Sequence, residues 1–158
     1  LIYRVFRVKT AKRPLKAYAE DNIFKIYTLD VGLLGALADI PINLHVQGDN
    51  IFQEFKGALV ENYVVQELKA CRGLQLFYWE SQGTAEVDFV AEDSGSVFPL
   101  EAKAGISKRS KSLKVFDQKF QPPYLIRTTQ LNLKQDGRIL NLPLPLPLYE
   151  VSSFPWLQ

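Results

Sequence analysis

The chain has 158 residues, 47% of them hydrophobic, and this length suits one domain or one domain with an appendage. Its formal net charge at pH 7 is +2, and no apolar run approaches the roughly 20 residues that span a bilayer, so we expect a soluble, cytoplasmic protein without a membrane partner. Because Cys71 and His45 are the only cysteine and histidine, an intramolecular disulfide and a cysteine-rich zinc site are excluded, and hydrolytic chemistry would rest on carboxylates and lysines.

The first 48 residues are predicted to form an N-terminal extension. Residues 1–9 alternate as a β-strand does, a basic linker follows, and residues 24–27 offer a second strand. Asp30 is placed to cap a short helix over residues 31–38. Because the chain begins inside a strand-like alternation and contains no methionine, we expect it to be a piece of a longer protein.

Residues 49–158 are predicted to form the main domain. A turn at residues 48–50 leads into the longest helix, from residue 51 to about residue 71. Gly73 follows the helix at a position suited to a left-handed C-terminal cap.

The rest of this domain alternates between strand and helix patterns. In chain order we predict strands at 74–79, 85–92 and 97–104, a helix at 110–120 and a buried strand at 124–128. This order predicts an α/β fold with a mixed central sheet flanked by helices. The proline-rich segment 141–151 fits either an extended ligand for an SH3-like partner or a strand packed on the domain.

Two predicted strands bring charged side chains together. If residues 93–96 form the loop of a simple hairpin, Asp88 lies opposite Glu101, Glu86 lies opposite Lys103, and all four side chains share one face. Opposed carboxylates repel each other, and a divalent cation such as Mg²⁺ or Mn²⁺ would offset that repulsion. Lys103 would then lie where it stabilises charge on a phosphate or orients the attacking water. The alternative is an exposed sheet face with an ion pair between Glu86 and Lys103.

A further acid, Glu61, lies in the apolar stripe of the long helix. It shares that stripe with small and apolar residues: Gly57, Ala58, Val64, Val65 and Leu68. A carboxylate at such a position is costly without a partner, so we expect Glu61 to point at the sheet as a third acid. Alternatively, Glu61 bonds to a buried tyrosine or lysine. Glu86 or Gln66 would lie just outside the metal ligands and contribute to the site from there.

The segment EVDFV, followed by EAK, resembles the D-x(n)-(D/E)-x-K motif of the PD-(D/E)XK nucleases, and archaeal Holliday-junction resolvases show a similar layout. In that superfamily a helical acid precedes the motif, as Glu61 does here. The resemblance implies a nuclease-like fold with Glu61, Asp88, Glu101 and Lys103 as catalytic residues, the three acids binding Mg²⁺ or Mn²⁺. Val87 stands where the superfamily name has proline.

A longer resemblance covers most of the chain. The phrases that carry it are PLKAYAEDNIFKIYTLDVGLL, FKGALVENYVVQEL, YWES, AEVDFV and PLEAKAG. They are similar to an uncharacterised C-terminal domain that follows an AAA-type ATPase module in many bacterial and archaeal proteins. This implies an upstream ATPase module as a partner, and residues 1–9 would be the remnant of a winged-helix segment. Since no G-x-x-x-x-G-K-[ST] loop occurs, we expect no ATP site in this chain.

Two basic clusters favour nucleic acid as a partner. Residues 1–16 hold six bases and no acid. The second cluster follows Lys103, and its expected contacts to a nucleic-acid backbone come from Lys108, Arg109, Lys111 and Lys114. Either cluster could instead be ordinary solvated surface.

These features predict a Mg²⁺-dependent phosphodiesterase of the endonuclease type, acting on DNA. A homodimer is compatible with this prediction, because nucleases that cut both strands often dimerise. The alternative is a non-catalytic module of the parent ATPase that serves DNA binding, regulation or oligomerisation.

Overall fold

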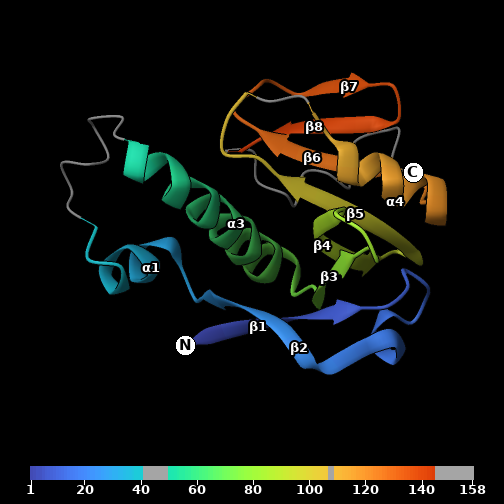
Figure 1. The fold of residues 1–158 in the computed structure, drawn as a ribbon, viewed down its shortest axis with the longest axis horizontal. Helices are drawn as coiled ribbons and strands as arrows, with labels where there is room; N and C mark the ends of the chain where they lie inside the picture. Colours follow the sequence, from blue (N-terminus) through green and yellow to red (C-terminus); the bar gives the residue numbers. More distant parts are fainter. Residues whose placement is uncertain (41–49, 107–108, 145–158) are drawn as a thin grey trace.

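A computed structural model describes residues 1–40, 50–106 and 109–144. Its described part contains an eight-stranded mixed sheet in the order β2-β1-β3-β4-β5-β6-β8-β7. Figure 1 shows the β1–β2 hairpin at one edge of the molecule and β6, β7 and β8 at the other, with α3 lying beside the sheet. The predicted mixed α/β class is therefore confirmed.

The strands are β1 (Ile2–Val8), β2 (Ala19–Thr28), β3 (Leu76–Glu80), β4 (Glu86–Asp93), β5 (Ser96–Ala102), β6 (Leu125–Thr129), β7 (Lys134–Asp136) and β8 (Ile139–Pro143). The helices are α1 (Val31–Leu37), α3 (Asn50–Arg72) and α4 (Lys111–Phe120), with a short 3-10 helix, η1 (Leu15–Tyr18). None of the helices in this described part has the length and hydropathy of a membrane span.

The sheet continues across the predicted domain boundary. The boundary itself, between residues 48 and 49, lies outside the described residues. On its N-terminal side, β1 pairs antiparallel with β2 and parallel with β3, so the first 28 residues supply two strands of the sheet that also contains β4 and β5. This placement lets the long side chain of Lys25 on β2 reach Glu86 on β4.

The two faces of the sheet bury separate clusters. On one face, here called the α3 side, residues of α3 pack with Val5, Tyr27, Leu76, Tyr78, Phe89, Ala91, Leu100, Ile126, Leu140 and Leu142. On the other, the α4 side, Leu113 and Phe116 of α4 pack with Val8, Leu15, Phe77, Trp79, Val87, Val90, Leu125 and Ile139. These sets alternate along the strands, as side chains of a sheet must when both faces are covered.

Local signals fixed several element boundaries. The carboxylate of Asp30 accepts a hydrogen bond of 2.8 Å from the Leu33 amide, which confirms the predicted helix cap. Gly73 has φ 59°, the left-handed conformation predicted for the residue after the long helix. Of the proline-rich segment 141–151, residues 141–143 lie in β8, and residues 145–151 lie outside the described residues.

Aromatic packing anchors α4 to the sheet. Phe116 is fully buried, and its ring lies 5.4 Å from that of Trp79 and 4.7 Å from that of Phe120, between ring centroids. We predict that Phe116→Ala lowers the free energy of unfolding by about 3–5 kcal/mol, because it removes a large buried side chain and leaves a cavity. Val115→Ala, on the exposed side of the same helix, should change it by no more than about 0.5 kcal/mol. Denaturant unfolding checks both values, and similar losses in the two variants would contradict this packing.

Candidate active site

Glu61 of α3 points at the sheet, as predicted. Its Oε2 accepts a hydrogen bond of 2.9 Å from the hydroxyl of Tyr27, which is 7% exposed. Burial, followed by the charge of Glu61, raises the pKa of Tyr27 far above its ordinary value, so the tyrosine remains a donor. The predicted alternative, a bond from Glu61 to a buried tyrosine, is thus confirmed as a contact; a metal role for Glu61 stays a prediction.

Asn62, which the sequence analysis did not single out, fixes the position of Glu61. Its side-chain Oδ1 accepts hydrogen bonds from the Thr28 amide (2.8 Å) and the Thr28 hydroxyl (3.0 Å). Asn62 is 1% exposed, so these bonds satisfy a buried amide and hold α3 against the end of β2. Glu61, the preceding residue, therefore meets Tyr27 in a fixed position.

A β-bulge in β4 turns Asp88 toward α3. Against β3, two residues of β4, Asp88 and Phe89, lie opposite Tyr78 alone. Val87 and Val90, which flank this pair, both pack on the α4 side, whereas Phe89 packs on the α3 side. The extra residue thus places Asp88 on the α3 side together with Phe89, where strict alternation would have put them on opposite faces.

Asp88 is partly buried. Its Oδ2 accepts a hydrogen bond of 2.8 Å from the Ala102 amide of the neighbouring strand. Burial and then the negative charge of Glu61 raise the pKa of Asp88 to about 7, against the lowering effects of the Ala102 bond and the charges of Lys103 and Lys25. Glu61 and Asp88 therefore interact electrostatically, although they lie on a helix and a strand far apart in the sequence.

The predicted hairpin register is confirmed along most of β4 and β5. Ser94 and Gly95 form the turn, both with positive φ, and residue pairs follow the predicted register from Asp93–Ser96 to Phe89–Leu100. The predicted placement of four charged side chains on one face is wrong, because the bulge in β4 breaks the alternation on which that prediction rested.

Glu101 and Lys103 form an ion pair at the end of β5. Phe98, Leu100 and Ala102 pack on the α3 side, so alternation directs Glu101 to the α4 side. Glu101 is 3% exposed and its Oε1 lies 2.8 Å from the Lys103 Nζ. Its Oε2 is buried and has no hydrogen-bond partner within the described part of the chain. Glu101 thus retains an unused acceptor next to the lysine.

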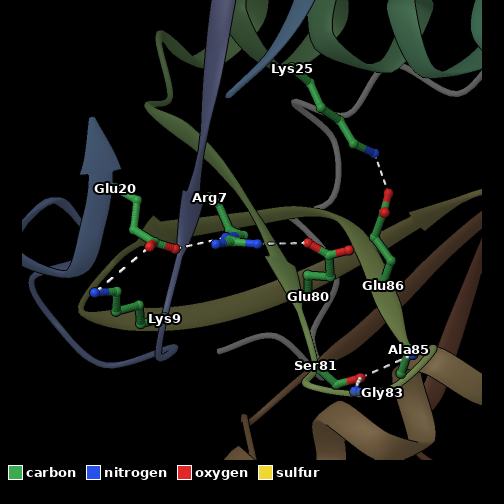
Figure 2. Close-up of polar contacts among 9 residues, drawn as sticks. All are labelled: Arg7, Lys9, Glu20, Lys25, Glu80, Ser81, Gly83, Ala85 and Glu86. Carbon is green, nitrogen blue, oxygen red and sulfur yellow. Dashed lines mark hydrogen bonds and ion pairs between the residues drawn. The ribbon is translucent and has the colours of Figure 1, made fainter. Parts of the chain in front are cut away.

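Glu86 pairs with Lys25 of β2 (Figure 2), and the predicted alternative of an ion pair between Glu86 and Lys103 is wrong, because Lys103 pairs with Glu101. The Lys25 ammonium donates to Glu86 Oε1 and lies 5.1 Å from the centre of the Tyr78 ring. Burial lowers the pKa of Lys25, but the Glu86 bond and the charges of Glu61, Glu86 and Asp88 together raise it above its ordinary value. Lys25 is therefore a charged member of the site.

A signal for Lys25 was present in the sequence. In β2, Ile23 and Tyr27 both pack on the α3 side, and Lys25 lies between them in the same alternation. A lysine in that register implies an acidic partner on the buried face. The sequence does not show which strand supplies this acidic partner, because the distance between β2 and β4 depends on the strand order of the whole sheet.

A second charged network lies beside this cluster (Figure 2). Arg7 Nε lies 2.7 Å from Glu20 Oε2 and Arg7 Nη1 lies 3.0 Å from Glu80 Oε2, while Lys9 Nζ lies 3.7 Å from Glu20 Oε1. Two bases of the predicted N-terminal basic cluster are thus paired with acids of β2 and β3. This pairing reduces the attraction of that surface for a polyanion.

The predicted nucleic-acid contacts lie around the start of α4. Lys108 lies outside the described residues, while Arg109, Lys111 and Lys114 are exposed. Since α4 packs on the face of the sheet opposite α3, the structure does not place these bases together with Glu61 and Asp88. Gln66, expected near the site, instead accepts a hydrogen bond of 3.2 Å from the Val31 amide at the start of α1.

The three predicted metal ligands do not form one set. In the described ranges, no group of three or more His, Cys, Asp or Glu side chains is arranged to hold a metal ion. The fold instead directs two acids, Glu61 and Asp88, to the α3 side, where the charge of Glu61 raises the pKa of Asp88. Mg²⁺ is commonly held by one or two carboxylates, with water and substrate oxygens completing its shell. The pair therefore fits a divalent cation, and the repulsion between its members is what such a cation would relieve.

Comparison with known proteins gives one match. The family model described as "Domain of unknown function (DUF4143)" matches residues 56–149, which include Glu61, Asp88, Glu101 and Lys103. No curated protein and no solved structure matches the chain.

The raised pKa of Asp88 predicts how stability depends on pH. The folded state holds the Asp88 proton up to about pH 7, whereas an unfolded Asp loses it near pH 3.9, roughly its reference pKa. This contribution to stability is fully present below the unfolded pKa and is lost as the pH rises through about 7.

Asp88→Asn keeps an oxygen acceptor for the Ala102 amide but cannot ionise. From pH 4 to pH 8, with chelator present, its free energy of unfolding should therefore rise relative to wild type by roughly 1.4 kcal/mol for each unit of the pKa shift. Urea unfolding across this range checks the prediction. A difference between the two proteins that is constant with pH would show that Asp88 titrates normally.

Proposed function

The chain belongs to the DUF4143 family, and we propose that it acts as a divalent-cation-dependent phosphodiesterase on nucleic acid, built on a nuclease-like core of the PD-(D/E)XK type. The observation that carries this proposal is the electrostatic coupling of Glu61 and Asp88 on the α3 side. A protein that brings two carboxylates together in a partly buried place incurs an energetic cost that a bound cation removes.

Glu61 and Asp88 are the residues that would hold the cation. Tyr27 orients Glu61 through its hydroxyl, and the Ala102 amide orients Asp88, so each carboxylate keeps one oxygen that these bonds do not use. When bound, Mg²⁺ or Mn²⁺ would polarise the phosphodiester and help to generate the attacking hydroxide. Glu101, the predicted third ligand, contributes in this proposal by holding Lys103, with Oε2 as its unused acceptor.

Lys103 is the residue that would interact with the phosphate of the substrate. Its ammonium lies 2.8 Å from Glu101 Oε1, and its positive charge lowers the pKa of Asp88, so Lys103 interacts with both acids. Lys103 is 33% exposed, which leaves the ammonium accessible to a substrate. A fixed positive charge at this position stabilises the negative charge that develops on a phosphoryl oxygen during hydrolysis.

The motif layout supports the nuclease-like core. Asp88 and the Glu101–Lys103 pair come from adjacent strands of one hairpin, and Glu61 comes from the helix that precedes it. The exposed bases Arg109, Lys111 and Lys114 lie around the start of α4, away from Glu61 and Asp88, and would contact a separate stretch of the nucleic-acid backbone. We propose that this nucleic acid is DNA. An upstream AAA-type ATPase module of the parent chain would be a further partner, and this chain itself would bind no ATP.

One observation favours the alternative of a non-catalytic module. Lys25 already supplies positive charge to Glu61, Glu86 and Asp88, and within the described residues no three-ligand set is formed. A domain with this arrangement could bind DNA, or regulate an attached ATPase, without cleaving it. Cleavage and binding must therefore be measured separately.

We predict Mg²⁺- or Mn²⁺-dependent cleavage of duplex or branched DNA that falls by about 100-fold or more in Lys103→Met and in Asp88→Asn, because each removes a charge needed in the transition state. The exposed control Lys134→Met should retain wild-type activity. Gel assays report cleavage, and fluorescence anisotropy in the presence of chelator reports binding. Wild-type protein that binds DNA but leaves it intact with either cation would establish the non-catalytic alternative.

A further inference from the structure

Lys25, like Tyr27, comes from outside the helix and hairpin that carry Glu61 and Asp88. It lies on β2, and β1 separates β2 from β3 in the sheet. Its ammonium nevertheless reaches Glu86 on β4 (Figure 2), and it lies over the ring of Tyr78 on β3. The Lys25 side chain is 28% exposed and that of Glu86 is 39% exposed, so solvent screens the pair only in part.

The charge balance of this cluster is uneven. Three carboxylates, Glu61, Glu86 and Asp88, act electrostatically on Lys25. Lys103 is paired with Glu101 and so offsets only part of the remaining charge. With all three acids ionised, Lys25 leaves a formal excess of two negative charges, which is the charge of one divalent cation. The ammonium thus neutralises part of the charge to which the metal would bind.

We propose that Lys25 is a built-in counter-ion of the carboxylate cluster that competes with the divalent cation and so sets the affinity of the site for metal. This inference rests on the proposed metal site at Glu61 and Asp88. Because the ammonium and the metal interact with the same negative charges, each weakens the binding of the other by the same factor. Lys25 therefore stabilises the metal-free protein and lowers its affinity for Mg²⁺ and Mn²⁺.

An ion pair with a purely structural role would behave differently. If Lys25 served only to join β2 to β4 through Glu86, its removal would lower stability and leave metal affinity unchanged. If it competes with the metal, its removal lowers the stability of the metal-free protein and raises metal affinity together. The two outcomes separate in a binding measurement.

The test uses three variants of the chain. Lys25→Met removes the charge and keeps most of the apolar stem, whereas Lys25→Arg keeps the charge. Lys9→Met is the matched control, because it removes a lysine of the same edge of the sheet that pairs with Glu20 and is 73% exposed (Figure 2). Titration calorimetry with MnCl₂ and MgCl₂ gives the affinities, and the thermal shift on adding each metal gives a second readout that does not depend on activity.

We expect Lys25→Met to bind Mn²⁺ about fivefold more tightly or better, with a larger metal-induced rise in Tm, while Lys25→Arg and Lys9→Met stay at the wild-type affinity. Metal binding that appears only in Lys25→Met would also support the counter-ion role. Two results would overturn the counter-ion role without affecting the proposed metal site. One is Mn²⁺ binding by Lys25→Met that is equal to or weaker than that of the wild type. The other is tighter Mn²⁺ binding by Lys25→Arg as well as by Lys25→Met. If neither the wild type nor Lys25→Met binds metal, the metal site and the counter-ion both fail.

Discussion

The repulsion between Glu61 and Asp88 is the constraint on which the site depends. Burial of Asp88 near a second carboxylate is unfavourable, and the surrounding structure offsets this cost with specific partners. The Tyr27 hydroxyl bonds to Glu61, the Ala102 amide bonds to Asp88, and Lys25 adds positive charge nearby. These partners come from two strands, β2 and β5, so the site depends on the sheet order that joins β2 and β1 to β3, β4 and β5.

The elements with strong local signals could be predicted from the sequence. Asp30 and Gly73 marked helix ends by their capping chemistry, and the hairpin turn at Ser94 and Gly95 set the register of β4 and β5. Strands β7 and β8 were missed as a pair, because β7 is a short polar segment. The Asp136–Gly137 step, with Gly137 at φ 62°, was the available turn signal for that hairpin.

The candidate site was predicted in its residue types and only partly in its geometry. Alternation alone placed Asp88 on the face of Glu101, but the bulge opposite Tyr78 turns Asp88 to the α3 side, and a bulge leaves no reliable mark in a single sequence. Asn62 and Lys25 were missed because their roles depend on contacts with strands far away in the sequence, Thr28 for the first and Glu86 for the second. Glu61 was found because an acid in an apolar helical stripe requires a partner.

The central claim is that Glu61 and Asp88 form a site for a divalent cation, and calorimetric titration of Mn²⁺ into wild type, Asp88→Asn and the control Asp21→Asn tests it most directly. Asp21 is an exposed residue of β2, and Asp21→Asn removes one carboxylate from the protein, as Asp88→Asn does. The account predicts micromolar to millimolar binding in wild type and Asp21→Asn that is lost in Asp88→Asn. Absence of binding in wild type, or equal binding in Asp88→Asn, would contradict it.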